Sequence, residues 1–289
     1  FFGCYNIFMD LLFILSAFVL GTLVGSFVNV ISLRYGTGLS PTVGRSQCFS
    51  CSTQLKWFEL IPVVSFIFLK GECRTCKTKI SYQYPLVEFV LGVVFIGIIL
   101  RQISLWPIYS SFDNGLLYSS LLAVYYFVIF SILFVIMIYD FHHKIIPNFF
   151  VYLFILLSSA KLLFFMYLRY PGITHMDLFD LSAPLLLFVA FGLLWLVSGG
   201  RWIGFGDVKL VFGIGALLGF IYGIGAVVLG FWIGALWSIF ILIKQKLFNT
   251  GENFGMKSEL PFAPFLIVGT ILVFLLRMDV MNLSGFFGI

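Results

Sequence analysis

Long apolar runs alternate with short polar segments along most of the chain. A helix needs about 20 predominantly apolar residues to cross roughly 30 Å of hydrocarbon. Eight runs approach that length: residues 10–31, 84–100, 116–139, 148–168, 181–197, 208–222, 224–243 and 261–277. The pattern predicts an all-α polytopic membrane protein with about eight transmembrane helices. The sixth and seventh runs are the least distinct, because IYGIGAVV offers only glycines and a tyrosine for a turn, and one long broken helix is the alternative.

The composition supports this class and excludes an ordinary soluble domain. Hydrophobic residues make up 61% of the 289 residues and charged residues 10%, whereas soluble domains have roughly 45–50% and about 25%. The first run is too long, and too regularly patterned with glycine in GTLVGSFVNV, for a cleaved signal peptide, so we expect a retained span. The chain opens FFGCYN without an initiator methionine, which leaves room for a longer native N-terminus.

Basic residues gather on one side of the predicted spans. If the N-terminus lies outside, thirteen of the seventeen Lys and Arg residues fall in segments assigned to the cytoplasm. Charge played no part in choosing the spans, so this positive-inside bias is an independent test of the topology. We therefore expect a multi-pass protein of the cytoplasmic membrane, in contact with membrane lipid, with both termini outside. The net charge of +5 is interpreted as topogenic, and no nucleic-acid partner is expected.

A long polar interval, residues 32–83, lies between the first two runs on the predicted cytoplasmic side. We expect three parts in the chain: a first span over residues 1–31, a small cytoplasmic domain over 32–83, and a seven-span domain over 84–289. About fifty residues scarcely form a stable core alone. The middle part therefore needs another source of stability.

Four cysteines in this interval can supply it. Cys48-Phe-Ser-Cys51 and Cys73-Arg-Thr-Cys76 are two C-x-x-C pairs separated by 21 residues. Two residues between cysteines let both sulfurs turn onto one ion, and two such pairs make a closed, tetrahedral structural site. We predict zinc. Iron, two disulfides or a redox pair are the alternatives, and a reducing cytoplasm disfavours disulfides.

Two acidic residues stand out by position. Asp140 ends the apolar run SLLAVYYFVIFSILFVIMIYD and Asp207 begins VKLVFGIGALLGF, so both lie at the predicted cytoplasmic boundary of the membrane. Two carboxylates at one depth suit an aspartic protease, in which one takes a proton from water while the other polarises the scissile carbonyl. Acids at span ends are also common as simple boundary markers. Other acids, Asp177 and Asp180 among them, are interpreted as solvated residues of outer segments.

Gly204 and Gly206 flank Phe205 just before Asp207. Glycine permits backbone conformations and close approach that side chains block, so we expect an extended substrate peptide to be positioned here. Asp207 also has the place of an N-cap residue for the following helix. The purely structural alternative is a tight entry turn into a capped helix.

The chain resembles the bacterial prepilin peptidases, or type IV leader peptidases, of the GxGD aspartic protease group. The resemblance runs from about residue 21 to 277 through GSFVNV, C-x-x-C, FELIPVVSF, GECRTC, ISYQYPLVE, YDFHHKIIPN, GFGDVKL and LPFAPFL, in that order. It implies a protease of the bacterial inner membrane that removes the basic leader of type IV prepilins or type II secretion pseudopilins at the cytoplasmic face, typically after Gly. It places Asp140 in a D-x6-P motif completed by Pro147, Asp207 in GxGD, and the four cysteines in zinc knuckles.

The same resemblance implies a methyltransferase activity that uses S-adenosylmethionine on the new N-terminal residue. The sequence offers no recognisable Gly-rich cofactor loop. Glu59 and Arg34 are candidate cofactor contacts, together with Glu88 and Asn29, because they are polar groups near the cytoplasmic edge in matching motifs. A structural role is the favoured alternative for each of the four.

Three departures from the group's pattern are visible. RYGTG lacks the proline that often follows the position of Arg34, Glu72 stands where a basic residue is common, and Ala263 replaces the Gly of PFGPF. None touches the aspartate pair. The first two fall in the domain linked to methylation, which makes that activity less secure than proteolysis.

Two other functions stay open at this stage. A transporter or channel with a structural zinc domain would use Asp140 and Asp207 as ion or proton sites, and predicts acids near mid-membrane. A membrane thiol oxidoreductase needs reactive cysteines on the oxidising side of the membrane, whereas the four clustered cysteines are assigned to the other side.

Overall fold

The computed structural model describes residues 2–38, 40, 44–48, 50–110, 114–248 and 261–281. These residues form helices joined by short connections, with two isolated β-bridges and no β-strand among them. The chain divides into two compact units, Phe1–Val135 and Ile136–Ile289. The division falls inside helix α4 (Gly115–His143), and the two units are described separately below.

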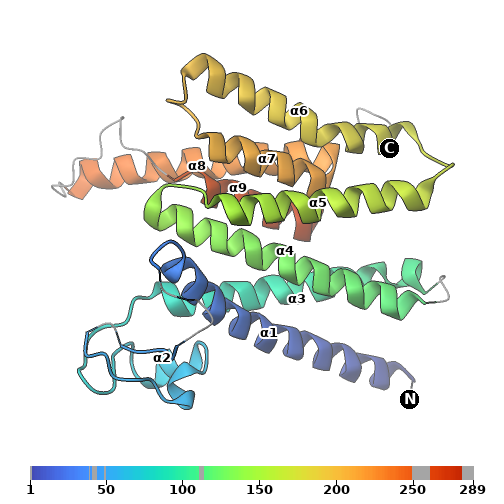
Figure 1. Ribbon diagram of the computed structural model, residues 1–289. Helices are drawn as coiled ribbons and strands as arrows, with labels where there is room; N and C mark the ends of the chain where they lie inside the picture. The colour runs from blue at the N-terminus through green and yellow to red at the C-terminus, as the bar shows by residue number, and fades with distance from the viewer. Residues whose placement is uncertain are drawn as a thin grey trace. The chain divides into compact units, whose positions relative to one another are not determined.

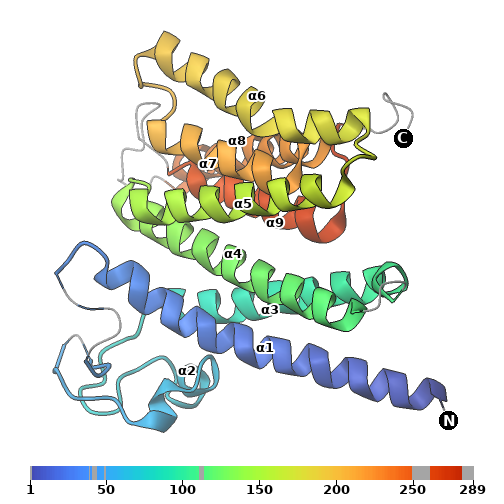
Figure 2. The ribbon, with the colours of Figure 1, turned by 45° about the vertical axis from the view of Figure 1, so that its right-hand side comes forward.

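The N-terminal unit is built on a close antiparallel pair, α1 (Phe2–Arg34) and α3 (Gln83–Tyr109), which lie side by side in Figures 1 and 2. A Cβ added to Gly21 would meet the Gly92 backbone at 2.7 Å, and one added to Gly25 would meet Glu88 Cα at the same distance. Only small residues allow helix backbones to approach this closely in a membrane. The GTLVG pattern therefore sets the register of α1 against α3.

The polar interval of this unit folds into short elements at one end of the pair (Figure 2). These are a 3₁₀ turn, η1 (Trp57–Leu60), and the five-residue helix α2 (Val64–Phe68). The buried carboxylate of Glu88 in α3 accepts a hydrogen bond of 2.7 Å from the Val63 backbone N–H. That bond ties the start of α2 to the transmembrane pair.

The C-terminal unit centres on α7 (Phe205–Leu218), which lies between α5 (Asn148–Arg169) and α6 (His175–Ser198) (Figure 1). Helices α8 (Phe220–Phe248) and α9 (Ala263–Leu276) pack on each other and on α7. Most of the α7 side chains are fully buried, including Val208, Leu210, Val211 and Ile214. The apolar run after GFGD is therefore the core of this unit.

Helix α7 ends abruptly at Gly219, which has φ of +79°. Asp180 of α6 accepts a hydrogen bond from the Phe220 N–H at 2.8 Å, which caps the start of α8, while Lys161 of α5 donates to the Leu217 carbonyl at 2.8 Å. A Cβ on Gly223 would lie 3.3 Å from Gly215 Cα, so the chain reverses here. Backbone groups freed at membrane depth must be satisfied within the protein, and these two charged side chains do so.

Asp177 and Asp180 thus differ from the sequence prediction, which gave both a solvating role. Asp177 is buried, forms an ion pair with Arg169 and caps the first turn of α6 together with Thr174. The hydrogen-bond and ion-pair partners of the two aspartates come from other helices or from the connection before α6. The sequence around Asp177 and Asp180 therefore gives no indication of these partners.

All eight predicted segments are helical, which confirms an all-helical membrane protein. Within the described part of the chain, six helices are long and apolar enough to span: α1, α3, α4, α5, α6 and α8. Helices α7 and α9 have 14 residues each, about 21 Å at 1.5 Å per residue, which is shorter than a complete span. The sixth and seventh segments part at Gly219 rather than at residues 222–224, because only there does the backbone leave the helical region. The predicted three-part division at residues 31 and 83 stays a prediction.

Candidate active site

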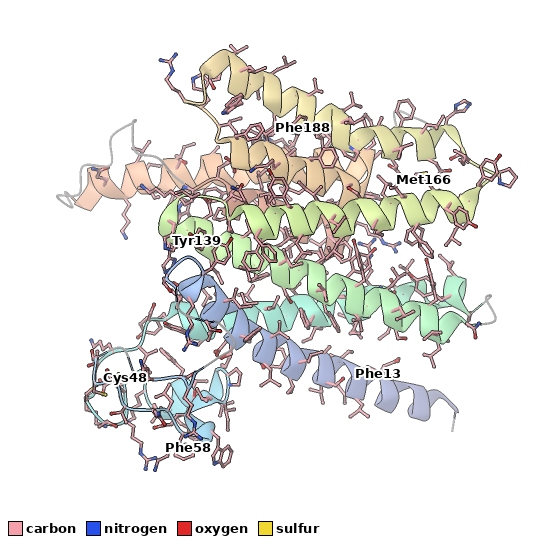
Figure 3. All side chains as sticks on the ribbon, viewed as in Figure 1. Phe13, Cys48, Phe58, Tyr139, Met166 and Phe188 are labelled. Carbon is pink, nitrogen blue, oxygen red and sulfur yellow. The ribbon has the colours of Figure 1, made fainter. Side chains whose placement is uncertain are left out.

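Asp140 is placed by the end of α4. Lys144, with φ of +54°, closes the helix through a 2.7 Å bond from its N–H to the Asp140 carbonyl. Pro147 then precedes the first residue of α5 as its N-cap, a position where a missing N–H costs nothing. The six residues between Asp140 and Pro147 form the last turn of α4, its left-handed cap at Lys144 and the turn into α5. Tyr139, beside Asp140, is labelled at this end of α4 in Figure 3.

Asp207 is placed by the start of α7. The N-cap is Gly204, so Asp207 is the third helical residue, and its carboxylate accepts a 3.3 Å bond from the Gly204 N–H. The prediction that Asp207 is itself the N-cap is wrong, because the helix begins two residues earlier, at Phe205. Gly204 has φ of −72° and ψ of 147°, extended backbone that any residue can adopt, so its role is not conformational freedom.

The close approach of α7 to Ile146 explains the glycine at position 206. A Cβ on Gly206 would lie 2.9 Å from Cβ of Ile146, a distance that real Cβ atoms essentially never show. Ile146 belongs to the turn between α4 and α5. The absent side chain thus lets the first turn of α7 rest directly on the turn that follows Asp140, and so brings the two aspartates together.

The two carboxylates form a buried pair. Asp140 is 4% exposed and Asp207 8%, and they are near enough for their charges to interact. The Ala263 backbone N–H, at the start of α9, interacts with the Asp140 carboxylate. The Asp140 oxygen Oδ2 is buried without a hydrogen-bond partner among the described residues. One acceptor of the pair is therefore left for a group from outside the chain.

The contact with Ala263 corrects the sequence prediction that none of the three departures touches the aspartate pair, because Ala263 is one of them and its backbone interacts with Asp140. Ala263 is fully buried as the first residue of α9, whose backbone N–H groups favour a nearby anion. Nearby polar side chains turn elsewhere. Lys209 donates to Asn148 Oδ1 at 2.5 Å, and His142 and His143 contact backbone carbonyls of their own helix.

The four predicted cysteine ligands form a second cluster, in the N-terminal unit. Their sulfur atoms all lie within 4.8 Å of one another, and the Sγ atoms of Cys48 and Cys76 are 3.8 Å apart. Tetrahedral coordination with metal–sulfur bonds of about 2.3 Å puts sulfurs roughly 3.8 Å apart. The cluster therefore fits a single metal ion. Figure 3 labels one of the four ligands, Cys48.

Each half of the cluster repeats the same local structure. The first cysteine donates its N–H to the carbonyl of a threonine five residues on, Thr53 or Thr78, at 3.0 and 2.8 Å. The threonine hydroxyl also contacts the second cysteine's sulfur, at 3.3 Å for Cys51 and 3.2 Å for Cys76. These hydrogen bonds lower the pKa of the Cys51 thiol, and they lower that of Cys76 to about 6. A depressed pKa favours the thiolate that a metal ion requires.

Thr53 and Thr78 are missing from the sequence predictions, yet the sequence carries a signal for them. CFSCST and CRTCKT both place a threonine two residues after the second cysteine. An isolated bridge flanks each half at equivalent positions, Gln47 with Gln54 and Glu72 with Lys79. The repeat shows that the two halves are matching knuckles.

The predicted cofactor contacts are engaged locally. Glu59 accepts a 2.7 Å bond from the Lys56 N–H and closes the η1 turn. Arg34 donates to the Ser40 carbonyl at 2.9 Å. Asn29 donates to the Tyr84 carbonyl at 3.3 Å between α1 and α3, and its own Oδ1 is buried without a partner among the described residues. These contacts are structural, and they leave the prediction of cofactor binding untested.

Comparison with known proteins gives consistent matches along the chain. A model described as the bacterial peptidase A24 N-terminal domain matches residues 19–102, and one described as the type IV leader peptidase family matches residues 127–239. A prepilin leader peptidase/N-methyltransferase of Bacillus subtilis (strain 168) is 30% identical over 264 residues, covering 89% of this chain and 92% of the relative. Proteins with the same description from Stutzerimonas stutzeri and Pseudomonas aeruginosa are 27% and 26% identical, each over 89% of this chain and 89% and 88% of the relative. No solved structure matches the chain significantly.

Proposed function

The chain belongs to the type IV leader peptidase family, and on that premise we propose that Asp140 and Asp207 are the catalytic pair of a membrane aspartic endopeptidase. Its activities are cleavage of the prepilin leader and N-methylation of the product. The observation that carries the assignment is the burial of the two carboxylates beside each other, with one acceptor oxygen unpartnered. The relatives do not favour a transporter or channel.

The proposed chemistry uses one water and no covalent intermediate with the enzyme. An ionised carboxylate takes a proton from water while the protonated partner gives its proton to the scissile carbonyl oxygen, so the water oxygen adds to carbon and a tetrahedral diol forms. The first carboxyl group then protonates the amide nitrogen, the C–N bond breaks, and the second carboxylate takes a proton from the diol, which leaves a carboxylic acid on the leader and a free amine on the product. The Gly204 N–H and the Ala263 N–H each hold one carboxylate in place. Asp140 Oδ2 is then available to the water or the carbonyl.

The proposed substrate position rests on the predicted topology. The pair lies where α4 ends and where α5 and α7 begin, and the helices start and end there with Lys144, Arg201 and Lys209 in their flanking turns. The positive-inside bias favours the cytoplasmic face for this end. We propose that the basic leader stays in the cytoplasm, the apolar helix of a prepilin or pseudopilin lies in the bilayer, and cleavage after Gly occurs at the boundary between them.

The exposed backbone at Gly204, with Gly206 behind it, is the proposed surface for the extended segment around the scissile bond. Extended peptides need neighbouring backbone without intervening side chains for close contact. Gly204 opens directly onto Asp207, since a Cβ there would lie 3.3 Å from the carboxylate. Bulky side chains at this position would occupy the space in front of that group.

The metal in the cysteine cluster is proposed to be zinc. Four thiolates close the coordination sphere, so the site is structural and has no open position for a substrate. It would hold together a segment in which η1 and α2 contain no buried residue. Metal analysis of the purified chain should find one zinc per protein, and loss of any of the four cysteines should remove it.

S-adenosylmethionine is the proposed methyl donor, which would supply an electrophilic methyl group to the new N-terminal amine. Glu59 and Arg34 are proposed as contacts of this molecule. Their present hydrogen bonds use backbone partners only 3 and 6 residues away. Each of these bonds uses one atom of its side chain, Arg34 Nη1 and Glu59 Oε2, and the proposal assigns the other polar atoms of both groups to the donor.

Co-expression with a model prepilin tests both activities. The mass of the product's N-terminus should correspond to loss of the leader plus one methyl group. Leader loss without the added methyl would support the peptidase and contradict the methyltransferase. An uncleaved prepilin beside a folded, membrane-inserted enzyme would contradict the main proposal.

A further inference from the structure

The polar interval of the N-terminal unit exposes an unusual set of large apolar side chains. Trp57 of η1 is 78% exposed, Phe68 of α2 is 82% exposed and Tyr82, just before α3, is 80% exposed, and Ile67 of α2 is 67% exposed. We call these four residues the aromatic patch. Figure 3 labels Phe58, the neighbour of Trp57, at this end of the unit.

One aromatic of the same elements, the half-buried Phe66 of α2, packs against the rest of the segment. Phe66 packs its ring against Gly71, where a Cβ would lie 2.9 Å away, and meets the Tyr82 ring edge-on at 5.4 Å. Phe66 thereby fixes α2 so that Ile67 and Phe68 face outward. Large apolar residues presented together in this way mark an interaction surface.

The segment that carries the patch is rich in basic residues. Residues 56–79 contain five basic residues, Lys56, Lys70, Arg74, Lys77 and Lys79, against two acidic ones. Two of them, Lys56 and Arg74, lie over the Phe58 ring at 6.0 and 5.4 Å from its centre. Apolar groups in a basic segment fit the headgroup layer of an anionic bilayer, where aromatic rings insert and cations meet lipid phosphates.

The patch is also continuous along the chain with an exposed apolar face of α3. From Tyr82, the exposed side chains Leu86, Phe89 and Val93 follow at intervals of four, three and four residues. This spacing is one face of a helix, and α3 is a candidate span. Lipid on this face of α3 would therefore meet Tyr82 and, through it, α2.

We propose that the aromatic patch is seated in the headgroup layer of the anionic membrane that the chain spans, so that the cysteine-rich segment is held on the membrane surface. Both ends of the segment are already anchored by α1 and α3, so insertion costs little further ordering. A protein partner or bulk water on the patch are the competing outcomes.

Full-length protein, one copy per lipid nanodisc, provides the test. The emission of Trp57 is obtained as the difference between the wild-type protein and Trp57→Phe, with Trp106→Phe in α3 as the matched control for removal of one tryptophan. In nanodiscs of brominated phosphatidylglycerol we expect most of the Trp57 emission to be lost, and acrylamide in the water to quench little of what remains. Brominated phosphatidylcholine should quench it less.

Two variants probe the patch itself. Phe68→Ser should restore Trp57 emission in brominated lipid, and Arg74→Gln should reduce the difference between the two headgroups, both with unchanged metal content as evidence of an intact segment. Trp57 emission that acrylamide quenches freely would overturn the proposal in favour of water. Emission that neither quencher reaches would overturn it in favour of a protein contact.

Discussion

Substitution of Gly206 by alanine tests the packing that joins the two aspartates. The new Cβ would lie 2.9 Å from Ile146 Cβ and 3.2 Å from two further Ile146 carbons. Carbon atoms in contact normally stay about 3.5–4.0 Å apart. The first turn of α7 and the turn after Asp140 must therefore separate by roughly 0.6 Å or more.

We expect Gly206→Ala to lower the rate of cleavage. A misplacement on the order of 1 Å can lower the rate of an enzyme about 100-fold, equivalent to about 2.7 kcal/mol of transition-state stabilisation. A shift of somewhat more than half that size should reduce kcat/KM for a model prepilin by roughly ten- to a hundredfold. The unfolding free energy should also fall, by the roughly 1–3 kcal/mol typical of overpacking.

The assay is the rate of leader removal by purified enzyme in lipid nanodiscs. Gly192→Ala in α6 is the matched control, because its Cβ would meet only one side-chain carbon, at 4.0 Å. In Gly206→Ala, the further change Ile146→Gly removes all three contacted atoms and should restore part of the rate. A Gly206→Ala enzyme as fast as wild type would refute the reasoning, as would a double variant no faster than the single one.

Other predictions concern the cysteine cluster and the helix break. Thr78→Val removes the hydroxyl at 3.2 Å from Cys76 Sγ, so the pKa of the Cys76 thiol should rise and protons should compete better with the metal for the sulfur. Zinc affinity at neutral pH, measured by competition with a chelator, should fall roughly tenfold. An unchanged affinity would contradict the assigned contact. Gly219→Ala places a Cβ against the Asp180 carboxylate at φ of +79°, so it should lower the thermal midpoint by an amount corresponding to about 1–3 kcal/mol. Gly192→Ala should be neutral or slightly stabilising in the same scan, and equal midpoints for the two would contradict the described break.

Much of the fold can be predicted from the sequence, because hydropathy reports span positions directly. The apolar runs give eight of the nine α-helices of the described residues, all but the short α2. They do not give the lengths of α7 and α9, since an apolar run continues through Gly219 and only the backbone there shows that the helix has ended. The roles of Lys161 and Asp180 were likewise hidden, because each caps a helix that is distant in sequence.

The candidate site divides in the same way. Spacing within one segment predicts the cysteine cluster, and equal depth in the membrane predicts the approach of Asp140 and Asp207. The Ala263 contact depends on which helix start reaches Asp140, and no local pattern contains that information. At Gly204 the sequence suggests a backbone conformation that only glycine adopts. The observed backbone there is ordinary extended structure, which any residue can adopt.

The most direct test of the central claim is the mass of a model prepilin's N-terminus after incubation with Asp140→Asn or Asp207→Asn enzyme. Asparagine preserves the size of each side chain but cannot exchange the proton that the reaction needs. Both variants should insert in the membrane, retain the metal and leave the prepilin uncleaved. A mature N-terminus produced at the wild-type rate by either variant would contradict the assignment of the pair.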